Sequence, residues 1–334
     1  MIITRTPYRI SFFGGGTDYP SWYSENGGAV LGTTIDKYCY ISVRHLPNFF
    51  EHTHRIVYSK VETVKTVDQI NHPAVRGVLS FFDVQSGLEI HHDGDLPARS
   101  GLGSSSSFTV GLIQALRALN GHSSSPKYLA EQAIHIEQNI IREAVGSQDQ
   151  IWAAYGGTNL IKFLQDGSFE IRPVIIGRDR RAALESHLML FFTGRSRLSE
   201  KFAQGQIDNL QANKDDLREI HKMVEIGHQQ ITDDQSDLRD FGRLLHESWQ
   251  RKRKLAKGIT NDEIDELYNR ALAAGAIGGK LLGAGGGGFL LIFVEPDKRK
   301  NVSSALAGLV EVPLKISSPG SRVIVFEPDE GVPE

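Results

Sequence analysis

Apolar residues that recur at every third or fourth position predict helices in both halves of the chain. One covers residues 104–119 and stops before Gly121, a residue that suits a C-terminal cap. Another covers residues 126–142 after Ser125, which favours an N-cap. Residues 199–256 are mostly helical, and a further helix spans about 261–274. The apolar stripes are Phe108, Leu112, Ala115, Leu116 and Leu119; Leu129, Ala133, Ile136 and Ile140; Leu217, Ile220, Val224, Gly227 and Ile231; and Leu238, Phe241, Leu245 and Trp249.

Runs of β-branched and aromatic residues predict strands between these helices. They cover residues 2–13, 29–46, 55–64, 86–93, part of 157–176, 187–193, 289–294 and about 322–327, with a last helix near 298–308. The polar segment 177–186 predicts a boundary between two halves. The expected fold class is therefore α+β, with one domain over residues 1–180 and a second over 181–334.

Composition and charge exclude some classes of protein but do not indicate a function. The chain has 334 residues, 40 acidic and 37 basic side chains and a net charge of −3, which gives no electrostatic reason to expect nucleic acid or an anionic membrane as partner. The one cysteine, Cys39, excludes an intrachain disulfide and a cysteine-based zinc site. No signal stretch and no apolar run of about 18 residues is present. We expect a cytoplasmic protein.

A glycine- and serine-rich run at residues 97–112, PARSGLGSSSSFTVGL, predicts an anion site. Gly101 and Gly103 free the backbone to curl, and the next residues open a helix whose first N–H groups have no internal partner. The helix dipole adds positive potential there, which suits a di- or triphosphate. A flexible linker is the alternative, but an apolar helix follows at once. The run lacks the Gly-Lys-Ser/Thr of a Walker A loop.

Two carboxylates beyond this run are candidates for chemistry, and spacing alone leaves both open. Glu137 lies close to the apolar stripe of residues 126–142, where Mg²⁺ and nucleotide phosphates would fit it. A solvated Glu137, or one paired with Arg142, is slightly favoured by spacing. Asp149 precedes an apolar segment, where it could take a substrate hydroxyl proton or cap the segment starting at Gln150.

Two further glycine clusters lie near the ends of the chain. In RTPYRISFFGGGTDYP, residues 5–20, Arg9 is on a strand and Asp18 follows three glycines. Asp18 could bind vicinal sugar hydroxyls or simply close a turn. In GGKLLGAGGGGFLLIF, residues 278–293, the glycines match a dinucleotide pattern, but a helix precedes and a strand follows them. That order is wrong for a nicotinamide site, so we expect this backbone to pack closely on the 99–107 loop or a ligand.

The histidine and basic clusters carry weaker hypotheses. His52, His54, His91 and His92 have no partners of metal-ligand spacing and are interpreted as surface or strand residues. The cluster 251–254 is interpreted as a solvated helix face, and Arg195 and Arg197 as surface residues. Either basic group could hold a substrate phosphate.

The three glycine-rich segments, in this order, resemble the GHMP kinase superfamily, which includes galactokinase, homoserine kinase, mevalonate kinase and phosphomevalonate kinase. With HIEQ (135–138) and SQDQIWAAYGG (147–157), the resemblance spans nearly the whole chain. Within the superfamily the heptose 7-phosphate kinases are the most similar, on FFGGGTDYP, GGAVLGTTIDKY, SGLGSSSSFTVGL, GSQDQIWAAYGGTN and GGKLLGAGGGGFLLIF. The C-terminal kinase half of bifunctional fucokinases is also similar.

The resemblance implies a fold, a reaction and a set of site residues. The N-terminal domain would resemble ribosomal protein S5 domain 2, and the C-terminal domain would be ferredoxin-like. The enzyme would use ATP and Mg²⁺ to phosphorylate the anomeric hydroxyl of D-glycero-D-manno-heptose 7-phosphate, giving the 1,7-bisphosphate for nucleotide-heptose and cell-surface polysaccharide synthesis. A fucose kinase and a non-catalytic ATP- and sugar-binding sensor are the alternatives. The oligomeric state stays open.

By motif position, each candidate residue takes a role implied by the resemblance. Asp149 would be the catalytic aspartate, with Arg9 beside it. Many members carry Lys where Arg9 stands, and Arg stays protonated, so Arg9 is expected to stabilise phosphoryl charge or Asp149. Ser105, or alternatively Ser104, and Glu137 would bind the metal. The ATP phosphates would lie on Arg99, Ser100, Gly101, Leu102, Gly103, Ser104, Ser105, Ser106 and Ser107, and the substrate on Asp18, Gly16, Thr17, Gly285 and Arg195.

Overall fold

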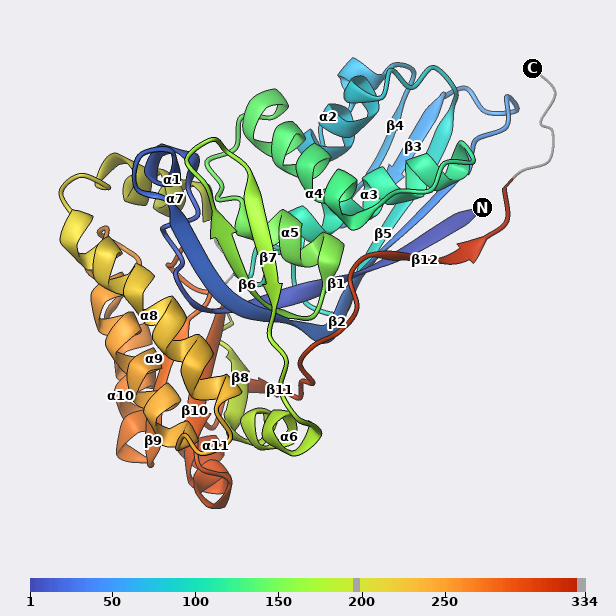
Figure 1. Cartoon of the computed structure of the whole chain (residues 1–334). Coiled ribbons are helices and arrows are strands. Elements are labelled where there is room, and N and C mark those ends of the chain that lie inside the picture. The colour runs from blue at the N-terminus through green and yellow to red at the C-terminus, as the bar shows by residue number, and fades with distance from the viewer. Residues whose placement is uncertain (195–198, 329–334) are drawn as a thin grey trace.

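The chain forms two β-sheets with helices packed between and around them, as the computed structural model of residues 1–194 and 199–328 shows (Figure 1). The strands are β1 (Ile2–Phe13), β2 (Gly28–His45), β3 (His54–Val57), β4 (Val61–Val64), β5 (Leu88–Gly94), β6 (Thr158–Phe163), β7 (Phe169–Pro173), β8 (Leu188–Phe192), β9 (Ala276–Leu281), β10 (Phe289–Val294), β11 (Val310–Val312) and β12 (Arg322–Phe326). The helices are α1 (Pro20–Asn26), α2 (Pro73–Phe81), α3 (Ser104–Leu119), α4 (Pro126–His135), α5 (Gln148–Tyr155), α6 (Arg178–His187), α7 (Ser199–Asp208), α8 (Lys214–Thr232), α9 (Leu238–Lys252), α10 (Asp262–Ala273) and α11 (Arg299–Ala305).

The larger sheet has eight strands and comes almost entirely from the first half of the chain. Its order is β12-β1-β2-β5-β3-β4, and β6 and β7 continue it beyond the other end of β2. The long strand β2 pairs with β5 through one part of its length and with β6 through another, because its 18 residues exceed the length of either partner. The last strand of the chain, β12, returns to pair with β1.

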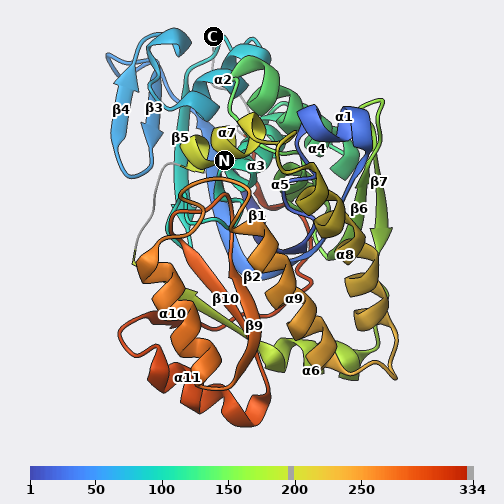
Figure 2. The ribbon, with the colours of Figure 1, turned by 90° about the vertical axis from the view of Figure 1, so that its left-hand side faces the viewer.

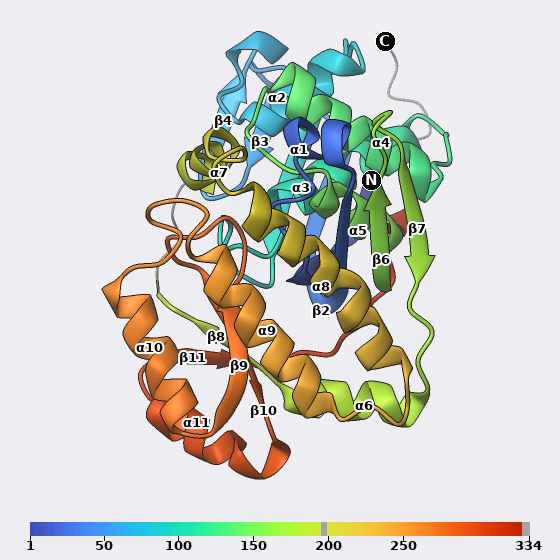
Figure 3. The ribbon, with the colours of Figure 1, turned by 60° about the vertical axis from the view of Figure 1, so that its left-hand side comes forward.

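The smaller sheet has the order β11-β8-β10-β9, and all its neighbours are antiparallel. Strand β10, FLLIFV, is buried along its whole length because helices and strands surround it. Figure 2 shows this sheet with α10 and α11 in the lower half of the molecule, away from the β3–β4 hairpin. Helix α8 packs on β1 and β2, whereas α9 packs on β1 and also on β9 and β10, so α9 connects the two sheets (Figure 3).

An aromatic cluster joins the two sheets through α9. Phe241 on α9 makes edge-on contacts with Phe12 and Phe13 at the end of β1, with ring centroids 5.4 and 5.1 Å apart. Its ring also lies 5.8 Å from that of Phe293 on β10. Buried aromatic pairs of this kind stabilise beyond their buried area. The cluster therefore fixes the end of β1, which carries Arg9, against the C-terminal half.

The helix predicted over residues 104–119 is confirmed as α3, but several other elements differ from expectation. The helix predicted over 126–142 becomes α4 followed by a π-helical turn, Ile136–Ile140. Residues 177–186, where the sequence predicts only a polar boundary, form most of α6, a polar helix that buries Leu184. Helices α1 and α2 have no predicted counterpart, and α5 is anticipated only as the apolar segment starting at Gln150, because each is too short for a repeating apolar stripe to appear.

Candidate active site

The glycine- and serine-rich loop opens α3, as the sequence predicts. Gly101 and Gly103 have φ angles of 88° and 75°, the left-handed region that favours glycine. Gly103 is the N-cap and carries no side chain to occupy the amides of the first turn. The helix therefore begins with unpaired N–H groups beside an open surface, which is the arrangement that binds phosphate in proteins.

The second glycine cluster packs on this loop. A Cβ atom added to Gly101 would overlap the carbonyl oxygen of Leu282, and one added to Gly288 would overlap that of Ser100. The amide of Phe289 also donates to the carbonyl oxygen of Ser100 at 3.2 Å. The expectation that the backbone of residues 283–288 lies against the 99–107 loop is therefore confirmed.

Arg9 and Asp149 form a two-bond ion pair at the start of α3. The Nε and Nη2 atoms of Arg9 donate to Oδ1 and Oδ2 of Asp149, both at 2.7 Å. The Nη1 atom of Arg9 donates to the carbonyl oxygen of Gly101, also at 2.7 Å. The two parallel hydrogen bonds from the planar guanidinium of Arg9 hold the Asp149 carboxylate in one orientation. Because a Cβ on Gly103 would lie only 3.2 Å from the Arg9 side chain, glycine at 103 lets the pair approach the helix start.

Asp149 lies in the first turn of α5, whose N-cap is Ser147. Its carboxylate is bound to Arg9 and remains about a quarter exposed. The alternative that Asp149 is the N-cap of the segment starting at Gln150 is therefore wrong. The exposed part of the carboxylate is free to accept a hydrogen bond from a ligand.

Asp18 is buried next to this pair. Its Oδ1 atom accepts a hydrogen bond from the Gly16 amide at 3.0 Å, so the turn-closing interpretation holds. Burial, and then the nearby charge of Asp149, raise the pKa of the Asp18 carboxyl. Gly146 leaves room for Asp18, because a Cβ at 146 would overlap Oδ2. Asp18 is nonetheless among the residues that line the adjoining cleft.

Glu137 is fully buried and faces the 99–107 loop, not solvent or Arg142. Its Oε2 atom accepts hydrogen bonds from Ser106 Oγ, at 2.9 Å, and from the Gln150 side chain. Burial raises the pKa of the Glu137 carboxyl to about 7. The π-helical turn that carries Glu137 shifts the side chain off a regular helical stripe, and such turns are frequent at functional sites.

The Glu137 site fits a bound Mg²⁺ ion by its donor chemistry. Within the described residues, Oε1 of Glu137 is buried without a hydrogen-bond partner. The nearby Thr109 hydroxyl donates to the backbone carbonyl oxygen of Ser105. A carboxylate and a hydroxyl beside a phosphate site are the ligands that Mg²⁺ takes. The hydroxyl in contact with Glu137 belongs to Ser106, whereas Ser105 is exposed and Ser104 accepts a hydrogen bond from the Arg99 amide.

Arg9, Asp18, Asp149 and the start of α3 line one cleft, which we call the cleft hereafter. Three segments of the first half contribute to it, and the C-terminal half closes it from the other side. Its polar lining includes Arg9, Ser11, Asp18, Arg99, Ser104, Ser105, Ser106, Gln148, Asp149, Gln206, Lys252 and Lys280.

Several predicted residues have structural roles or lie elsewhere. The hydroxyls of Ser100 and Ser107 donate to the carbonyl oxygens of Pro97 and Pro7, and Thr17 donates to those of Gly14 and Ala29. Leu102 is buried, and its carbonyl oxygen accepts from the Arg9 amide. Gly16 lines the cleft, but Gly285 packs on the backbone of Ile259. Arg195 and Arg197 lie outside the described residues.

Two lysines of the cleft were missed in the sequence. Lys252 was grouped with a solvated basic run, yet it is only 7 % exposed, and Lys280 is only 2 % exposed. The signal for Lys252 is its spacing: it continues the buried stripe of Leu245 and Trp249 by three residues. Lys280 follows two glycines on β9, and nothing in its local pattern indicates burial.

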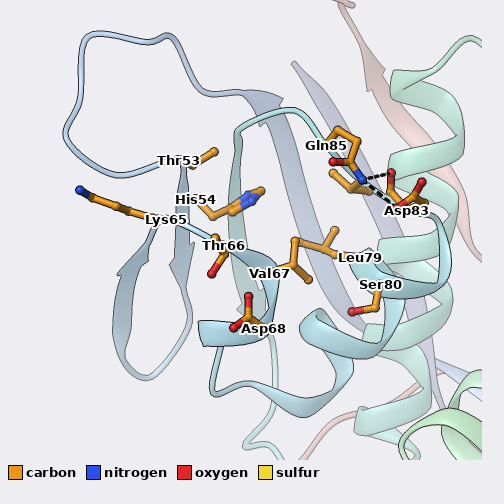
Figure 4. A pocket seen from close by; sticks show the side chains of 11 residues that line it. Thr53, His54, Lys65, Thr66, Val67, Asp68, Leu79, Ser80, Asp83 and Gln85 are labelled. Carbon is orange, nitrogen blue, oxygen red and sulfur yellow. Dashed lines mark hydrogen bonds between the residues drawn. The ribbon is translucent and has the colours of Figure 1, made fainter.

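A second hollow lies away from the cleft, between α2 and the β3–β4 hairpin (Figure 4). Its lining includes His54, Lys65, Asp68 and Ser80. Figure 4 shows these side chains spread around the hollow, with Gln85 bonded to Asp83. Among the described residues, no group of three or more histidine, cysteine and acidic side chains could hold a metal. In the part of the chain that the structure describes, no helix is long and apolar enough to cross a membrane.

Comparisons with known proteins agree with this geometry. The sequence profile of the GHMP kinases N terminal domain matches residues 64–157, and that of the GHMP kinases C terminal matches residues 228–311. D-glycero-alpha-D-manno-heptose 7-phosphate kinase of Campylobacter jejuni is 29% identical over 318 residues, 91% of this chain and 93% of that protein. The bifunctional fucokinase/GDP-fucose pyrophosphorylase of Arabidopsis thaliana is 26% identical over 93% of this chain, which spans only 31% of that protein.

A solved structure supports the same fold. It is that of a D-glycero-D-manno-heptose 1-phosphate kinase from Bacteroides thetaiotaomicron, with a TM-score of 0.80, 24% identity, and coverage of 98% of this chain and 100% of that one. The expected α+β, two-domain fold is confirmed. Since the two profiles together match more than half of the residues, on both sides of the cleft, this chain is a kinase that belongs to the GHMP kinase family.

Proposed function

We propose that this enzyme uses ATP and Mg²⁺ to phosphorylate the anomeric hydroxyl of D-glycero-D-manno-heptose 7-phosphate, giving the 1,7-bisphosphate. The observation that carries the proposal is the Arg9–Asp149 pair, held by two 2.7 Å hydrogen bonds against the loop that opens α3. It sets a carboxylate beside a phosphate-binding helix start. The heptose acceptor is supported by the similarity to the Campylobacter jejuni heptose 7-phosphate kinase.

Phosphoryl transfer needs positioning and charge neutralisation more than covalent catalysis. The amides of Gly103 to Ser106 would bind the terminal phosphates of ATP, with help from the helix dipole. Mg²⁺, when bound by Glu137 and a serine of the loop, supplies charge neutralisation for the phosphates. Ser106 is the hydroxyl that lies next to Glu137, although motif position favours Ser105.

Asp149 would receive or orient the proton of the attacking sugar hydroxyl. The oxygen of that hydroxyl forms the new bond to the γ-phosphorus as the bond to ADP breaks, and its proton passes through Asp149 to solvent. Arg9 stays charged, so it fixes Asp149 and offsets negative charge in the transition state. Asp18, which lines the cleft, would bind neighbouring hydroxyls of the sugar.

The test is release of ADP by the purified chain, measured with Mg²⁺-ATP and a panel of acceptors. The panel contains heptose 7-phosphate, the unphosphorylated heptose, L-fucose, galactose and a hexose 6-phosphate. We expect the largest kcat/KM with heptose 7-phosphate, and a product phosphorylated at the anomeric position by ³¹P NMR. A larger kcat/KM with L-fucose would identify L-fucose, and not heptose 7-phosphate, as the acceptor. ATP binding without ADP release would indicate a non-catalytic sensor.

A further inference from the structure

Lys252 is a cation of the cleft that comes from the C-terminal half of the chain. It is the last residue of α9, and its side chain lines the same cleft as the start of α3. It faces Arg9, Asp18 and Asp149 from the first half, and Lys280 from β9. None of the steps proposed above uses it.

The hydrogen bonds of Lys252 are incomplete. Its Nζ atom donates to the carbonyl oxygen of Gly283 at 2.6 Å. A lysine ammonium has three donors, and neither a second acceptor nor an ion-pair partner for Lys252 is found in the part of the chain that the structure describes. A buried cation without a counter-ion is costly. An anionic ligand in the cleft would offset that cost.

The charge state of Lys252 fits this role. Burial lowers the pKa of Lys252 to about 8, with Arg9 acting in the same direction and Asp18 and Asp149 opposing it. The ammonium form therefore predominates at neutral pH. Lys280 differs, because burial, followed by Lys252 and Arg9, lowers its pKa well below the ordinary value. Its Nζ donates to the carbonyl oxygen of Phe12 at 2.8 Å and joins β9 to β1.

The place where Lys252 is fixed points to the chemistry of the anion. Its partner Gly283 packs on Gly101, since a Cβ added to Gly283 would lie 2.5 Å from the Gly101 Cα atom. Gly101 in turn accepts a hydrogen bond from Arg9. The ammonium is thus linked through Gly283 to the 99–107 loop and lines the same cleft as that loop.

We propose that Lys252 binds phosphoryl oxygens in the cleft and so completes the active site from the C-terminal half. The proposal rests on the proposed function in that the phosphoryl group belongs to a substrate of this kinase. Two groups share this chemistry: the γ-phosphoryl group of ATP and the phosphate already present on the acceptor. Binding measurements distinguish them.

The test compares wild-type protein with Lys252→Met and with Lys254→Met, a matched control. Lys254 lies two residues beyond Lys252 but is exposed. Calorimetry with Mg²⁺ gives dissociation constants for ADP, for the non-hydrolysable analogue AMP-PNP, for heptose 7-phosphate and for the unphosphorylated heptose. Loss of one hydrogen bond to a charged group lowers affinity by about ten- to a hundredfold.

If Lys252 binds the γ-phosphoryl group, Lys252→Met weakens AMP-PNP but not ADP. If it binds the acceptor phosphate, the substitution weakens heptose 7-phosphate but not the unphosphorylated heptose. Lys254→Met leaves all four constants unchanged. A Lys252→Met protein that binds all four ligands as wild type does overturns the proposal.

A purely structural role for Lys252 predicts a different result. The substitution would then lower the free energy of unfolding and change ADP and AMP-PNP affinities equally, which also overturns the proposal. Should Lys252→Met fail to fold, Lys252→Gln, which keeps a donor to Gly283, is measured in its place. A wild-type protein that releases no ADP would contradict the proposed function. The comparison of AMP-PNP and ADP binding would still decide the role of Lys252, because binding needs no turnover.

Discussion

The two glycine-rich loops at the cleft have similar composition but opposite roles. Residues 99–107 run into helix α3 and leave its first amides open. Residues 283–288 run into strand β10 and pack backbone to backbone on the first loop. A glycine run followed by a helix can bind an anion, because the helix start has unpaired donors. In the second run, backbone N–H groups such as those of Gly286 and Gly288 already have acceptors within the protein, so this run packs against the first loop and leaves fewer donors for an anion.

The same division separates the two halves of the chain. The first half supplies the acidic groups Asp18, Glu137 and Asp149 together with Arg9. Among the described residues, the C-terminal half supplies packing and Lys252, a side chain of the cleft that is charged at neutral pH. Changes to the charged groups of the first half should therefore act on turnover and metal binding, and changes where the two loops pack on one another should act on stability. The predictions below test that division.

The largest effect is expected for Asp149→Asn. The substitution keeps the shape of the side chain but removes the proton acceptor, so kcat should fall by about 10²–10⁴-fold. AMP-PNP affinity, measured by calorimetry, should change far less. If turnover equals that of wild type, Asp149 is not the proton acceptor and the charged groups of the first half do not carry the chemistry.

Glu137→Gln should next show an altered metal requirement. Loss of the carboxylate charge removes the metal site predicted at Ser106 and Glu137, so the Mg²⁺ concentration needed for half-maximal AMP-PNP binding should rise by about 10- to 100-fold. Glu131→Gln, on the exposed face of α4, is the control. An unchanged Mg²⁺ titration would remove Glu137 from the metal site.

Gly101→Ala should lower the free energy of unfolding by about 2–3 kcal/mol. It combines an unfavourable φ with a collision against the Leu282 carbonyl oxygen. Gly167→Ala is the matched control: its φ is 86°, but nothing lies within 4 Å of an added Cβ. That change should cost about 1 kcal/mol. Equal losses in urea denaturation would mean that the two glycine loops do not pack on one another.

The smallest effect concerns pH and Lys252. The folded pKa of about 8 lies below the ordinary value of 10.5, so unfolding binds a proton between these values and this residue adds stability as pH rises through that window. The difference in unfolding free energy between wild type and Lys252→Met should therefore shift towards wild type from pH 8 to 10. Arg9, Asp18, Asp149 and Lys280 face the ammonium and shape this profile. A difference that stays constant with pH would contradict the assigned charge state.

Local sequence patterns predicted the parts of the fold and site that depend on neighbours in the chain. The stripe of residues 104–119 and the glycines before it were enough to place α3 and its open amides. The carboxylates were harder. Regular helical spacing through residue 142 puts Glu137 near the apolar stripe and slightly favours a solvated or Arg142-paired side chain, whereas the π-helical turn places it against Ser106.

Contacts between distant segments could not be predicted in this way. The Arg9–Asp149 pair joins residues 140 positions apart, and the hydrogen bond from Lys280 to Phe12 joins residues 268 positions apart. A basic run around Lys252 resembles a solvated face unless the stripe of α9 is extended to it. The resemblance to a family gave roles to residues, but only the packing of the two halves brings Lys252 into the cleft.

The most direct test of the central claim is a crystal structure with Mg²⁺ and AMP-PNP bound. We predict that the terminal phosphates lie within hydrogen-bond distance of the amides of residues 103–106, with the metal beside Glu137 and the γ-phosphorus facing Asp149. Phosphates bound elsewhere, with the start of α3 unoccupied, would contradict the account.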